Sequence, residues 1–124
     1  LGAVLIGLVS GVLVVYSINF FEKRGFDDAV GAVSVHGICG IWGVLAVAIF
    51  DTSDGLFYGG GTSLFGPQLI GILAIAAWAY GTSFLVFKVI DSTVGLRVTA
   101  EEEVAGLDAS EHGTTAYGDF ITKK

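Results

Sequence analysis

One imidazole stands inside a long stretch of the sequence that carries no charged side chain. Residues 29–50 contain no Asp, Glu, Lys or Arg, and His36 lies among them. An apolar stretch of about 20 residues is long enough to cross a bilayer as a helix. An ionisable side chain within such a span is costly, so it usually faces a pathway or a polar cavity. His36 is therefore the first candidate for chemistry, with a packing histidine as the alternative.

Small residues accompany this histidine at helical spacing. On a regular helix, Ala32, His36 and Gly40 lie one above the other, and Gly43 and Val47 continue the same face. A face that combines one imidazole with small or apolar groups is typical of the wall of a narrow lumen or of a tight helix contact. We take Ala32, His36 and Gly40 as candidate pore residues. So many glycines weaken an isolated helix, so this span needs other helices around it.

The composition predicts an all-α membrane protein that positions these residues on three transmembrane helices. Hydrophobic residues make up 53% of the 124 residues and charged residues only 15%. The expected spans are residues 1–21, 29–50 and 67–90, and Pro67 suits the first turn of the third. The chain contains no methionine, so we expect it to be a piece of a larger protein.

Several function classes find no support in the composition. The net charge is −6, half of it in residues 92–124, and no basic patch is present that would hold nucleic acid. Cys39 is the single cysteine, which excludes an intrachain disulfide and a metal site built on cysteines of this chain. With no nucleophile–base pair and no metal-ligand cluster, we expect neither an enzyme nor a bound cofactor.

The basic residues predict how the spans are oriented. All six fall on one side of the three-span arrangement: Lys23, Arg24, Lys88, Arg97, Lys123 and Lys124. The connection between the second and third spans, residues 51–66, has none. Since basic residues concentrate on the cytoplasmic side, the first span is expected to run inward, the second outward and the third inward.

Two adjacent carboxylates precede the second span. Asp27 or Asp28 can accept hydrogen bonds from free N–H groups at the start of that helix, where negative charge is also favoured. Capping with a solvated side chain is the simpler interpretation. The alternative is a buried structural carboxylate at the inner mouth of a pore.

The last part of the chain has a different character. We divide the sequence into a membrane part, residues 1–91, and a polar tail, residues 92–124. Thr99 followed three residues later by Glu102 is a capping box, which predicts a short helix that ends near Gly106. We expect residues 106–113 to form an ordered turn, with His112 as a surface residue rather than a metal ligand. A solvated tail without further structure is the alternative.

Three stretches together resemble the C-terminal part of the ammonium transporter family, which includes the Rh proteins. The first runs from Asp27 to Gly43 and contains His36-Gly-Ile-Cys39-Gly40-Ile-Trp42-Gly43. The others are Val94-Gly-Leu-Arg97-Val98 and residues 101–113, with Gly106-Leu-Asp108 and His112-Gly113. Their combination and order are specific, and the similarity extends over essentially the whole chain.

The resemblance implies a fold and an activity. Members of this family have eleven spans and form homotrimers in the cell membrane, with one pore in each subunit. This chain would supply the last three spans and a cytoplasmic tail. His36 matches the second of two neighbouring pore histidines that take part in moving ammonium or ammonia, and the first would lie upstream. A Rh-like gas channel and the membrane domain of an ammonium sensor are the alternatives within this resemblance.

The resemblance also implies a regulatory tail. In relatives the tail packs on the cytoplasmic face and contacts the neighbouring subunit, and bacterial members are blocked there by PII signalling proteins. Plant relatives are switched off by phosphorylation in the segment that matches residues 108–113. The matching tail positions in this chain are Arg97, Gly106, Asp108, Ser110 and His112.

Overall fold

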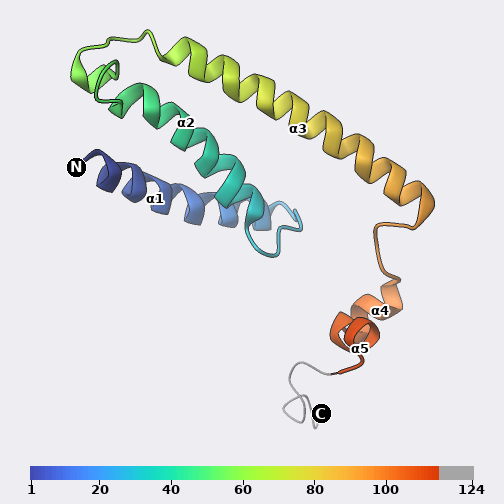
Figure 1. Ribbon diagram of the computed structural model, residues 1–124. Helices are drawn as coiled ribbons and strands as arrows, with labels where there is room; N and C mark the ends of the chain where they lie inside the picture. Colours follow the sequence, from blue (N-terminus) through green and yellow to red (C-terminus); the bar gives the residue numbers. More distant parts are fainter. Residues whose placement is uncertain (115–124) are drawn as a thin grey trace. The chain divides into compact units, whose positions relative to one another are not determined.

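The computed structural model describes residues 1–114, and within them it contains helices and turns but no strand (Figure 1). Three of its helices are long and apolar enough to cross a membrane: Gly2–Lys23, Val33–Phe50 and Phe65–Thr93. The predicted all-α class and the three predicted spans are therefore confirmed. Lys123 and Lys124, which entered the predicted orientation, lie outside the described residues.

The first helix, α1 (Gly2–Lys23), packs antiparallel against the second span. With 22 residues it is about 33 Å long, which matches the hydrocarbon core of a bilayer. Trp42 contacts Ile6 near the start of α1, and Cys39 contacts Ser10 one turn further on. The later residue of the second span thus contacts the earlier residue of α1, which shows that the two helices are antiparallel.

The second span begins later than its sequence indicates. A turn in which the Gly31 amide donates to the Asp28 carbonyl precedes it, and Gly31 has φ +66°. This left-handed backbone is incompatible with a helix, so residues 29–31 stay outside it. The span then consists of a π-helical turn, η1 (Val33–Ile38), followed by α2 (Cys39–Phe50).

A folded turn follows α2 at Asp51. The Asp51 carboxylate accepts hydrogen bonds from the amides of Ser53 and Asp54, and the Gly55 amide donates to the Asp51 carbonyl. The backbone of Asp54 lies so close to Gly60 that no side chain fits at that position. A short 3₁₀ turn, η2 (Leu56–Tyr58), lies between these two points. The glycine-rich connection is thus an ordered loop.

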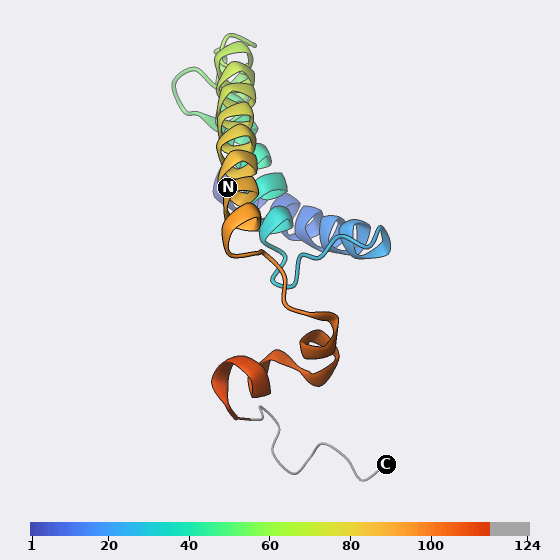
Figure 2. The same cartoon turned by 90° about the vertical axis from the view of Figure 1, so that its right-hand side faces the viewer.

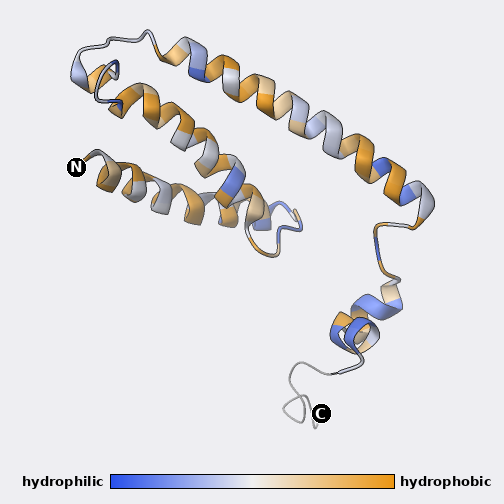
Figure 3. Cartoon of the chain, viewed as in Figure 1, coloured by the Kyte–Doolittle hydropathy of each residue, from blue (hydrophilic) through white to orange (hydrophobic). Residues whose placement is uncertain are grey.

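The third span, α3 (Phe65–Thr93), has 29 residues and no buried side chain. Pro67 lies in its first turn, as predicted. The helix is longer than a bilayer core is thick, so it must tilt or extend beyond the core. Its surface is mostly apolar, in contrast to the polar segment that follows (Figure 3).

Two short helices follow in the tail, α4 (Ala100–Ala105) and α5 (Leu107–His112). The capping box is present, and α4 ends at Gly106, so both predictions are confirmed. The expected ordered turn over residues 106–113 is wrong, because most of this segment is α5. Gly106, with φ +97°, ends one helix and begins the next without an intervening loop. The two short helices are seen in succession near the red end of the chain in Figure 2.

The chain divides into two compact units, Leu1–Ala79 and Tyr80–Lys124. In the first unit the core is the contact between α1 and the second span. Its fully buried side chains are few and small, namely Ser34, Ala46 and Ala48. Small residues at a helix contact let two backbones approach closely, which is the usual packing of helices in membranes.

Candidate functional site

His36 lies in the π-helical turn and is exposed in this chain. Ala32 and Gly40, the two other candidate pore residues, are also exposed. By contrast, Ser34 and Ala46 are buried against the rest of the first unit. His36 thus lies among residues that are open to other parts of a larger assembly. That these residues line a pore stays a prediction.

The turn that carries His36 is wider than a regular α-helix. The amide of Cys39 donates to the carbonyl of Ser34, five residues earlier, where an α-helix would use the fourth. This extra residue changes the direction of side chains before Ser34 relative to those after Cys39. The regular spacing that we assumed from Ala32 through His36 to Gly40 therefore does not hold across this turn. Single π turns are rare and often lie at functional sites.

Asp28 caps the start of the second span. Its two carboxylate oxygens accept hydrogen bonds from the amides of Ala32 and Val33, at 2.8 and 3.1 Å. These amides have no carbonyl partner within the helix, so the side chain satisfies them. The capping interpretation is confirmed for Asp28, whereas Asp27 is exposed. A structural role of either residue at the inner mouth of a pore stays a prediction.

Two side-chain donors hold α2 to α1. The indole Nε1 of Trp42 donates to the carbonyl of Ile6 at 3.1 Å, and Cys39 Sγ lies 3.6 Å from the carbonyl of Ser10. Sequence reasoning missed Trp42 as more than a packing residue. The signal was present, since an indole N–H within an apolar span needs an acceptor.

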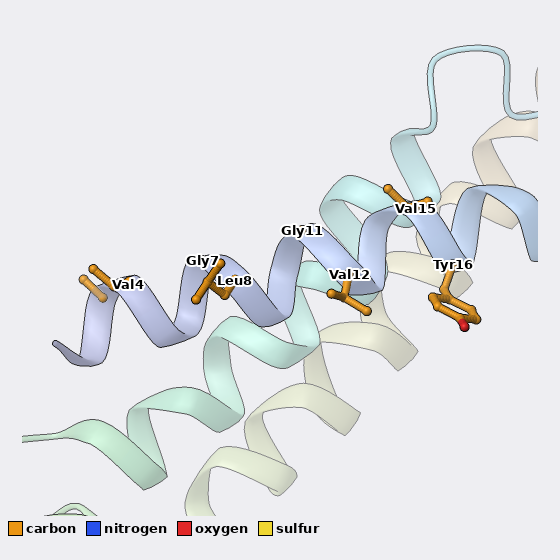
Figure 4. A pocket seen from close by; sticks show the side chains of 8 residues that line it. Val4, Gly7, Leu8, Gly11, Val12, Val15 and Tyr16 are labelled. Carbon is orange, nitrogen blue, oxygen red and sulfur yellow. The ribbon is translucent and has the colours of Figure 1, made fainter.

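An open apolar groove runs along α1 (Figure 4). Gly7 and Gly11 form its floor, and Val12 and Tyr16 lie at one end. His36 is not among the lining residues. The groove has almost no polar group to orient a small ligand, so its chemistry suits contact with another helix or with lipid.

The tail candidates lie on and around α4 and α5. Gly106 joins the two helices, Asp108 lies in the first turn of α5, and His112 is its last residue. Ser110 is exposed, and its hydroxyl donates to the Leu107 carbonyl at 3.4 Å. Arg97 is exposed in the segment before α4. The structure brings Asp108, Ser110 and His112 onto one short helix, while a regulatory role for them stays a prediction.

The carboxylate of Glu102 is held at the start of α4 by two hydrogen bonds. It accepts a hydrogen bond from the Thr99 amide and another from the Thr99 hydroxyl, both at 2.9 Å. The amide bond is the larger cause, and together they lower the pKa of Glu102 below its ordinary value. The charged form thus stabilises the first turn of α4. Within residues 1–114, no three His, Cys, Asp or Glu side chains cluster closely enough to hold a metal ion.

Comparison with known proteins decides the family. The family model described as "Ammonium Transporter Family" matches residues 1–117. The chain belongs to the ammonium transporter family. "Ammonium transporter Amt2" of Archaeoglobus fulgidus is 41% identical, over 96% of this chain and 28% of the relative. "Ammonium transporter" of Bacillus subtilis is 36% identical, over 96% of this chain and 31% of the relative.

The similar proteins include a plant transporter, and they are longer than this chain. "Ammonium transporter 1 member 1" of Arabidopsis thaliana is 33% identical, over 95% of this chain and 26% of the relative. The chain thus spans less than a third of the length of these relatives. No solved structure matches it. Family membership and the three apolar helices together identify a membrane protein.

Proposed function

We propose that this chain is the C-terminal part of an ammonium transporter, comprising its last three spans and its tail. Family membership over residues 1–117 and the short coverage of each relative support this assignment. In the complete protein, a homotrimer with one pore per subunit carries ammonium or ammonia across the cell membrane. Residues 1–91 belong to the membrane part and residues 92–124 to a cytoplasmic tail.

The observation that carries the proposal is the placement of His36. An intact ammonium ion loses its hydration in an apolar lumen, which costs many kcal/mol. An imidazole offers another route, because each of its ring nitrogens donates or accepts a hydrogen bond according to its protonation. Ammonium gives up its proton, crosses as ammonia, and the proton follows along the histidines. His36 is exposed, as are Ala32 and Gly40, and its imidazole is available for that relay.

The tail supplies regulation in this proposal. Its two short helices lie on the cytoplasmic side, where a PII signalling protein or a neighbouring subunit contacts them. Ser110 is exposed and lies two residues from Asp108 and one from Glu111. A phosphate there would add nearly two negative charges next to these carboxylates, and the repulsion would displace the tail.

The test compares His36→Ala with the wild type in the full-length transporter that contains this sequence. We expect ammonium-evoked current and the accompanying change of internal pH in liposomes to fall by about 100-fold, the lower range for loss of a proton-transferring group. Val35→Ala is the matched control, since Val35 is exposed in the same turn and carries no ionisable group. Full transport by an assembled His36→Ala protein would return His36 to the packing residues.

A further inference from the structure

The contact between α1 and α2 is asymmetric in its hydrogen bonding. The carbonyl of Ile6 already accepts a bond from the Ser10 hydroxyl at 2.9 Å, in addition to the indole of Trp42 at 3.1 Å. The carbonyl therefore does not depend on Trp42. The indole N–H, within a span where no water competes, does depend on the carbonyl. The bond constrains Trp42, and with it the rotation of α2 about its own axis.

A second donor repeats the arrangement one turn away. Cys39 Sγ lies 3.6 Å from the Ser10 carbonyl, and the two acceptor carbonyls belong to residues four apart on the same face of α1. The thiol is a weak donor, so the indole bond is the stronger of the two. The face of α2 that meets α1 is thus fixed by Trp42, with Cys39 in support.

The start of the span is fixed separately. Asp28 holds the amides of Ala32 and Val33, and Gly31 packs against Ile18, whose Cδ1 lies 3.2 Å from where a Gly31 Cβ would be. Between these anchors and the Trp42 contact lies the wide turn, closed by the bond from Cys39 to the Ser34 carbonyl. The segment between the Asp28 cap and the Trp42 contact therefore contains one residue more than a regular α-helix would hold over the same length. The π turn accommodates the extra residue.

This arrangement makes the direction of His36 depend on Trp42. We propose that Trp42 is a positioning residue, whose bond to the Ile6 carbonyl sets the rotation of α2 and, through the wide turn, the direction of the His36 side chain. Without the bond, α2 rotates on the smooth surface of α1, and the turn relaxes toward a regular helix. The inference rests on the proposed function in so far as the direction of His36 affects transport.

The experiment replaces the donor and keeps the ring. In the full-length transporter, Trp42→Phe removes the N–H, and an isostere that carries sulfur in place of the indole nitrogen does so without changing the shape. We expect the maximal ammonium uptake rate per assembled transporter to fall by about tenfold, as a small misplacement of a functional group does. We also expect the ¹⁵N signals of the His36 imidazole, assigned by their loss in His36→Ala, to shift, together with the pH profile of uptake.

Two variants serve as matched controls. Trp78→Phe makes the same chemical change on α3, outside the contact between α1 and α2, and should leave the His36 signals unchanged. Cys39→Ser retains a donor at the second contact and should behave likewise. A wild-type rate and unshifted His36 signals in both Trp42 variants would overturn the proposal. So would a loss confined to the amount of assembled protein, because Trp42 would then be a packing residue.

The experiments distinguish a failure of the proposed His36 relay from a failure of the Trp42 positioning role. If His36→Ala transports like the wild type, ammonium conduction does not use His36, whatever the Trp42 variants do. The ¹⁵N signals need no transport, so they still report whether Trp42 sets the direction of His36. A shift in Trp42→Phe would then uphold the positioning contact, and its absence would overturn it.

Discussion

The second and third spans have almost the same hydropathy, 2.0 and 1.9, yet the structure treats them differently. In the most apolar 18-residue stretch of the second span, Val33–Phe50, 17% of the residues are buried within the chain. No residue is buried in the corresponding stretch of Phe65–Thr93. The difference follows from small residues and polar donors on one face of α2. Hydropathy thus identifies a span, but it does not say which face meets protein and which meets lipid.

Enlarging a small side chain should have the most different effects on stability in the second and third spans. Ala46 is 1% exposed, so Ala46→Leu forces α1 and α2 apart and should cost about 1–3 kcal/mol of stability. Ala76→Leu makes the same change on an exposed face of α3. Thermal unfolding in detergent should show a lower Tm for the first variant and little change for the second. Equal shifts would mean that both helices are equally packed in the intact protein.

A glycine comparison tests the start of the second span. Gly31→Ala places a Cβ at φ +66° and 3.2 Å from Ile18 Cδ1, which should destabilise the protein by about 1–2 kcal/mol. Gly81 lies inside α3 with nothing near its missing side chain, so Gly81→Ala should stabilise by about 0.5–1 kcal/mol. Opposite changes in Tm would support the structure, and a stabilising Gly31→Ala would contradict the turn before η1.

The smallest effect concerns the turn that leaves α2. The amides of Asp54 and then Ser53 lower the pKa of Asp51 below its ordinary 3.8. A lowered carboxyl pKa means that the stabilisation is complete above 3.8 and is lost as the pH falls through the folded value. As the pH falls from neutral to about 3, the exchange rates of the Ser53 and Asp54 amides should therefore rise relative to those of unfolded peptides.

Substitution provides the control for this titration. Asp51→Asn should abolish the pH dependence, whereas Asp54→Asn keeps the donating amide and should preserve it. Protection of Ser53 that does not change on acidification would show that the carboxylate contributes nothing to the turn.

The three spans and the capping box could be predicted because each depends on residues close in sequence. Apolar length suffices for a span, and Thr99 with Glu102 suffices for the first turn of α4. The start of the second span was misplaced because Gly31 looks like any other glycine until its backbone angle is known. The α5 helix was missed because Leu107 is the only large apolar residue among its six, and one such residue gives no periodic apolar signal.

The candidate site shows a similar division. His36 was found because an imidazole in an uncharged span is conspicuous in sequence. The wide turn around it was not, since it lies between two contacts, those of Asp28 and Trp42, the second of which involves a residue of α1 far from His36 in the sequence. A regular helical repeat from Ala32 to Gly40 was the natural assumption, and it is wrong across this turn. Contacts between separate segments leave no periodic trace.

The single-residue joint at Gly106 has a consequence for proteolysis. A protease binds several consecutive residues in an extended conformation, and α4 and α5 leave no such stretch between them. A protease acting on the native tail should therefore spare the joint at Gly106 and leave the two helices in one piece.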